Sequence, residues 1–252
     1  MSAAVISCIA FACVLGGALL GMFLRASLPE HHLSTDSKDF VKLGTGLIAT
    51  MAALVLGLLI ASAKNSYDIQ RNELTQVSAS IIVLDRLMSN YGPETKEVRD
   101  LLRRSVVGAL NQMWPEHRSQ AAARLEPGVS SDALHDEIYR LTPHNEDQRL
   151  LKSQALTIIL NLRQTRWLEL EQRRGSSIPM AVLAMLVFWL AIIFVSFGLF
   201  APPNSTVLAV LFVCVLSVSG AIFLILELDR PFEGLIRIPS APLRDALVHL
   251  GQ

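Results

Sequence analysis

Four apolar segments, each about as long as a bilayer is thick, limit what this chain can fold into. A helix needs about 20 apolar residues to cross the hydrocarbon core of a membrane. The segments are Ala3–Leu24, Leu43–Ala63, Ile178–Phe200 and Val207–Leu226. Charged residues make up 17% of the chain, below the roughly 25% that is typical of soluble domains. The sequence therefore predicts an all-α integral membrane protein with four transmembrane helices, the first being a retained span because no basic segment precedes it.

The polar segment between the second and third spans is predicted to form a helical bundle. Apolar residues recur in it with helical spacing, and apolar stripes on long helices must be buried against a neighbour. The expected helices cover 64–91, 94–114, 132–141 and 146–174. The first of these continues from the second span without glycine or proline and ends at Gly92-Pro93. Asn145 is a suitable cap for the last helix.

The placement of Lys and Arg predicts how the chain lies in the membrane. Basic residues concentrate between the second and third spans and next to the membrane there, whereas the short 201–206 loop has none. Both termini and the bundle are therefore expected in the cytoplasm. The expected parts are 1–63, a first helix pair with an external loop 25–42; 64–176, the cytoplasmic helical domain; 177–228, a second helix pair; and 229–252, a cytoplasmic tail.

Motifs for catalysis, nucleotide binding or metal binding are missing from the sequence. There is no GxGxxG, P-loop, HExxH or GxSxG pattern, and the zero net charge does not suggest a nucleic-acid partner. Cys8, Cys13 and Cys214 lie in apolar runs without a CxxC spacing. His31-His32 could bind a metal together with nearby acidic residues, but we interpret them as part of a polar loop. We expect neither an enzyme nor a cofactor nor a bound metal.

The second span, GTGLIATMAALVLGLLIASAK, has small residues at almost every turn. Small side chains spaced four residues apart let two helices approach closely, and van der Waals contact then drives association in lipid. One ridge of this span consists of Gly46, Ala49, Ala53, Gly57 and Ala61. The first span has a similar pair, Gly17 and Gly21. We interpret these seven residues first as candidates for helix packing.

A second ridge of the same span predicts an apolar constriction. It consists of Leu47, Met51, Leu54 and Leu58, with Thr50 beside it as a hydroxyl that could line a pore. Copies of this helix around a rotation axis would form an apolar constriction, of the kind that gates a pore by dewetting. No span contains a charged residue, which argues against a proton relay or a coupled transporter.

The fourth span ends in a group of charges, Glu227, Asp229 and Arg230. An interfacial charge cluster, with the arginine neutralising one carboxylate, is favoured over a regulatory ion site. Two carboxylates next to an arginine bind a cation only weakly.

The second span, the helical insert after it and the closing LELDRPFEG together resemble the bestrophin-like membrane proteins of bacteria. These proteins are distantly similar to bestrophin chloride channels. The resemblance covers nearly the whole chain. It implies a multi-pass protein of the bacterial inner membrane that forms a homo-oligomeric ring, pentameric in true bestrophins, with the second helix lining the pore. It also implies that small inorganic anions such as chloride pass through that pore.

Two departures from true bestrophins stand out. Animal bestrophins follow the Pro-Phe-Gly turn with aspartates that bind calcium, whereas here Leu235, Ile236 and Arg237 occupy that region. Their neck is rich in aromatic residues, and the second span here has none, so Met51, Leu54 and Leu58 would take that role. An anion-conducting channel is the first hypothesis. A membrane-anchored scaffold or sensor, whose helical domain recruits partners, is the alternative.

Overall fold

The computed structural model describes residues 2–27, 35–114, 131–174, 179–202, 204–232 and 234–250, and every regular element within these ranges is helical. The chain divides into two compact units. We name them the span unit, Met1–Tyr67 with Ser176–Ile236, and the insert unit, Asp68–Gly175 with Arg237–Gln252. Four of the helices are long and apolar enough to cross a membrane. The predicted all-helical membrane fold is therefore confirmed.

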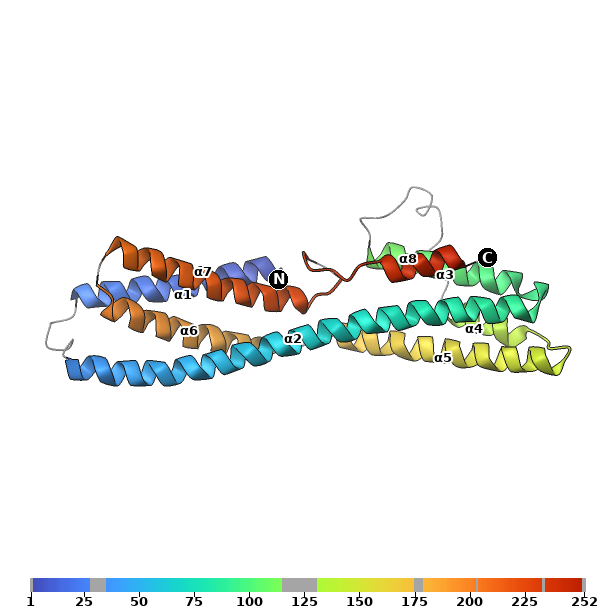
Figure 1. The fold of residues 1–252 in the computed structure, drawn as a ribbon, viewed down its shortest axis with the longest axis horizontal. Coiled ribbons are helices and arrows are strands. Elements are labelled where there is room, and N and C mark those ends of the chain that lie inside the picture. The colour runs from blue at the N-terminus through green and yellow to red at the C-terminus, as the bar shows by residue number, and fades with distance from the viewer. Residues whose placement is uncertain are drawn as a thin grey trace. The chain divides into compact units, whose positions relative to one another are not determined.

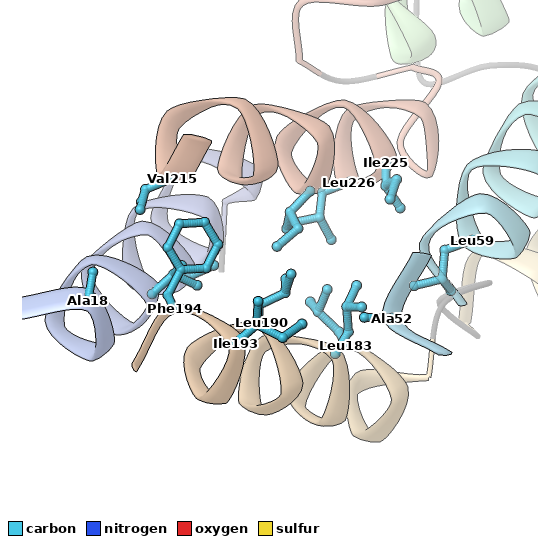
Figure 2. Packing of buried hydrophobic residues seen from close by; sticks show 14 of the residues in the cluster. Ala18, Ala52, Leu59, Leu183, Leu190, Ile193, Phe194, Val215, Ile225 and Leu226 are labelled. Atoms are coloured by element: carbon cyan, nitrogen blue, oxygen red, sulfur yellow. The ribbon is translucent and has the colours of Figure 1, made fainter. Parts of the chain in front are cut away.

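The helices of the span unit coincide closely with the predicted apolar segments. They are α1 (Ala3–Ser27), the N-terminal part of α2 (Thr35–Tyr91), α6 (Met180–Phe200) and α7 (Ser205–Leu228) (Figure 1). α1 packs along α6 and also contacts α7. The core between these helices is aliphatic except for Phe194, and Figure 2 shows Ala18, Ala52, Leu59, Leu190, Phe194 and Val215 among its members. Such packing is the main source of helix association in lipid.

α2 is a single helix of 57 residues, which confirms the predicted continuation of the second span. No glycine or proline lies between Leu58 and Tyr91, so nothing there interrupts the backbone hydrogen bonds. The helix stops at Gly92, whose φ of 140° suits glycine alone, and at Pro93, which has no amide proton. It begins at Thr35, several residues before the apolar segment, so its first two turns are mostly polar.

The insert unit contains the rest of α2 and four further helices. These are α3 (Lys96–Met113), α4 (Ser131–Arg140), α5 (Glu146–Arg174) and α8 (Ala241–His249), with a short 3-10 turn, η2 (Pro93–Thr95), before α3. Asn145 caps α5 as predicted, because its Oδ1 accepts the amide proton of Gln148 at 2.7 Å. The Gln148 side chain also donates to the carbonyl of Tyr91 at 2.9 Å, which connects the start of α5 to the end of α2.

The C-terminal tail contributes α8, a helix that the sequence analysis did not predict. α8 lies against α3 and buries Leu243 and Ala246. Just before it, the buried Trp114 donates its indole proton to the carbonyl of Ile238 at 3.1 Å. The tail, which the sequence places in a segment of its own, is thus attached to the insert unit.

Candidate functional site

One side of α2 within the span unit packs against the other helices of the same subunit. Thr45, Ala52, Leu59 and Ala63 are buried on this side, at spacings that return to one face of a helix. The hydroxyl of Thr45 donates to Ser196 Oγ on α6 at 3.1 Å, and Ser196 donates to the carbonyl of Ile192 at 3.1 Å. This side of α2 is therefore occupied within the subunit and fixes the orientation of the helix.

The predicted apolar ridge of α2 lies on the exposed side. Leu47, Met51, Leu54 and Leu58 are 65%, 44%, 75% and 70% exposed. Thr50 is exposed as well, but its hydroxyl donates to the carbonyl of Leu47 at 2.8 Å. The exposed ridge is thus aliphatic, and the one neighbouring hydroxyl proton is already used by the backbone.

The predicted small ridge of α2 also makes few packing contacts with the rest of the chain. Gly46, Ala53, Gly57 and Ala61 are exposed, and Ala49 is half-buried. A Cβ added at Gly46 or Gly57 would meet nothing within 4 Å. Within the described residues, this ridge therefore has no closely packed neighbour except at Ala49.

The small residues of α1 behave in the opposite way. Gly17 and Gly21 are buried and face α6, and a Cβ at Gly21 would overlap the backbone of Val195. Gly198 of α6 faces α1 in turn, where a Cβ would overlap the carbonyl of Ala18. These glycines let the two backbones come together within one subunit.

The carboxylate of Glu227 holds the loop that follows α7. Glu227 is only 6% exposed, and its Oε2 accepts the amide proton of Leu235 at 2.5 Å. The loop turns at Gly234, whose φ is 86° and whose Cβ, if present, would overlap the Glu227 carboxylate. Of the predicted charge cluster, Asp229 and Arg230 lie next in the chain and are half-buried. Glu227 thus acts here on the protein backbone.

Gly234→Ala is expected to release this loop. The left-handed backbone conformation is about 1–2 kcal/mol less favourable for alanine than for glycine, and the added Cβ also displaces the Glu227 carboxylate. Amide hydrogen exchange at Leu235 should therefore become faster. Gly220→Ala is the matched control, because nothing lies within 4 Å of a Cβ at Gly220. Unchanged exchange at Leu235 in the Gly234 variant would contradict this role of Glu227.

A buried ion pair in the insert unit was missed by the sequence analysis. Asp85 of α2 is 5% exposed and accepts two hydrogen bonds from Arg99 of α3, at 2.8 Å and 2.9 Å. The side-chain hydrogen bond with Asp85 raises the pKa of Arg99 above its ordinary value. The signal in the sequence was an aspartate within the apolar stripe of α2, between Leu84 and Met88. The pair fixes α3 on α2.

Metal-binding clusters do not occur in the part of the chain that the structure describes: no three His, Cys, Asp or Glu side chains come together there. His31 and His32, which the sequence analysis considered, lie outside the described residues. Cys8, Cys13 and Cys214 are exposed thiols on α1 and α7. The described residues therefore offer a helix face, rather than a ligand cluster, as the candidate site.

Comparison with known proteins identifies a family for this chain. No curated protein and no solved structure matches the chain. A protein family does match it: residues 12–243 correspond to the bestrophin-like domain. The match includes residues 12–27 of the first candidate span, the other three candidate spans complete, and the insert between them. Because this match covers most of the chain, the protein belongs to the bestrophin-like family.

Proposed function

We propose that this protein is a channel for small anions, formed by several copies of the chain in a ring. The observation that carries the proposal is the face of α2 with Leu47, Met51, Leu54 and Leu58, which is exposed and uncharged within a candidate span. In a ring, this face is directed toward the axis and forms an apolar constriction, with Thr50 beside it. The small ridge, Gly46 to Ala61, supports close contact with the next copy of α2.

Family membership and charge distribution support the finer features of this proposal. Similarity to bestrophin chloride channels supports anion selectivity and a pentameric ring. The excess of Lys and Arg between the second and third spans supports an orientation with both termini and the insert unit in the cytoplasm of a bacterial cell, the protein lying in its inner membrane. No step of the proposal requires a cofactor.

The proposal is tested by chloride flux from liposomes that contain the purified protein. Flux should exceed that of empty vesicles, and Leu54→Ala and Leu58→Ala should each increase it several-fold, because a smaller side chain widens the constriction and admits water more easily. Val213→Ala on α7, also an exposed apolar position (59%), is the matched control and should leave the flux unchanged. Flux no greater than that of empty vesicles, at every pH and voltage applied, would refute the channel.

A membrane-anchored scaffold or sensor is the second candidate function. It is favoured by the insert unit, which is compact and has its own core of residues such as Leu84, Met88, Val98 and Ile138. The two functions differ in one measurement. A scaffold binds a defined protein partner, and loses it when charges on the insert are reversed, without conducting chloride.

A further inference from the structure

Charged residues are spread unevenly over the exposed faces of the insert unit. On α3, every exposed residue from Lys96 to Arg104 is charged. α4 exposes Asp132, Asp136 and Arg140 next to the apolar Ala133 and Tyr139. α8 exposes Arg244, Asp245 and His249 next to Ala241 and Val248. Such faces are typical of protein surfaces that remain in contact with water.

α2 and α5 differ from these helices over several turns. Residues 74–84 of α2 and 153–162 of α5 contain no charged residue. Nevertheless both stretches expose one face. The exposed residues are Thr75, Gln76, Ala79 and Val83 on α2, and Ser153, Gln154, Thr157, Leu160 and Asn161 on α5. We name these two sets the neutral faces. Val83 is 49% and Leu160 is 53% exposed, so each neutral face includes a large apolar side chain.

Depletion of charged residues is a mark of the central part of a protein–protein interface. A solvated helix face has no reason to avoid Lys, Glu and Arg for three turns, because these residues favour both solubility and helix formation. We infer that the neutral faces of α2 and α5 are buried against neighbouring copies of this chain.

A second copy is the partner that fits these faces best. Copies related by a rotation axis perpendicular to the membrane hold equivalent residues at the same level. Uncharged faces complement one another, whereas a partner recruited through charge would be directed to α3, α4 or α8. Because copies in a ring meet through two different surfaces, a ring uses two faces of each subunit. This inference rests on the proposed ring and adds the surfaces by which its insert units meet.

Single cysteines test the inference in the full-length protein, after Cys8, Cys13 and Cys214 are replaced by alanine. Ala79→Cys reports on the neutral face of α2, and Thr157→Cys on that of α5. Arg103→Cys on α3 and Arg244→Cys on α8 are the controls. All four positions are exposed in the subunit, so the substitutions leave its core intact. The measurement is the rate of reaction with a charged maleimide, in the intact particle and after its separation into single chains by detergent, together with the mass of the particle.

In a particle of several chains, we expect Ala79→Cys and Thr157→Cys to react slower than the controls by at least about tenfold, because modification requires the interface to open. All four cysteines should react alike once the chains are separated. Equal rates in an intact multi-chain particle would overturn the inference and leave the ring standing. A particle with the mass of one chain would overturn both, and chloride flux then decides separately whether the protein conducts.

Discussion

Arg99→Ala is expected to destabilise the insert unit by about 3–5 kcal/mol, because it removes the arginine that balances the buried charge of Asp85. Asp85 is 5% exposed and Arg99 provides both of its hydrogen bonds from α3. The measurement is thermal or chemical unfolding of the purified protein, with hydrogen exchange to locate the change. Amides of α3 should exchange faster, while those of α1 and α6 should not.

Two further variants separate a buried charge from a simple loss of contact. Arg103→Ala removes an exposed arginine from the same helix and should change stability by less than about 0.5 kcal/mol. The double variant Asp85→Leu with Arg99→Leu should recover most of the loss, since a hydrophobic pair avoids the cost of removing two charges from water. If Arg99→Ala were no more harmful than Arg103→Ala, the ion pair would not hold α3 on α2.

Gly21→Ala is expected to destabilise the span unit strongly. Its Cβ would overlap the backbone of Val195, and a backbone cannot rotate away as a side chain can. α1 and α6 must therefore move apart, and the contacts along their whole length weaken. Overpacking in a well-packed core costs about 1–3 kcal/mol, and contact with backbone places this variant at or above the upper end.

Gly16→Ala is the matched control on the same helix, because nothing lies within 4 Å of a Cβ at Gly16. Thermal unfolding in detergent should show a clear decrease in midpoint for Gly21→Ala and none for Gly16→Ala. An intermediate decrease is expected for Gly17→Ala, whose Cβ would be 2.9 Å from the carbonyl oxygen of Ala191. Equal midpoints for all three variants would show that α1 and α6 do not approach as closely as described.

The positions of the helices were predictable from the sequence because hydropathy and helix-ending residues act locally. The four apolar segments predicted the spans, Gly92-Pro93 predicted the end of α2, and Asn145 predicted the start of α5. The nine residues of α8 were missed. Its buried residues Leu243 and Ala246 and its C-cap Leu250 do follow helical spacing, but a stretch this short is only marginally stable as a helix by itself, and contact with α3 stabilises it.

Which residues face the core was harder to predict. On α5, helical spacing from Ala155 points equally to Ile158 and Ile159 as the next inner residue, and of the two Ile158 is half-buried and Ile159 is buried. Two adjacent isoleucines give hydropathy no means to choose between them, and the partner helices decide. Asp85 was missed for a related reason: a buried carboxylate is recognisable only once Arg99 is known to lie next to it. The two ridges of α2 follow from spacing alone, but spacing did not show that both, apart from the half-buried Ala49, lie on the exposed side of the helix.

The proton that Thr50 gives to the Leu47 carbonyl has a consequence for how an ion would travel. Leucine and methionine side chains have no hydrogen-bond donor for a halide, and the Thr50 hydroxyl already donates its proton to the backbone. In the proposed ring, a chloride ion at this level must therefore keep its hydration water, since nothing on the wall can replace it. The open state has to be wide enough for the ion together with its water shell, and discrimination among anions would follow the cost of stripping that shell.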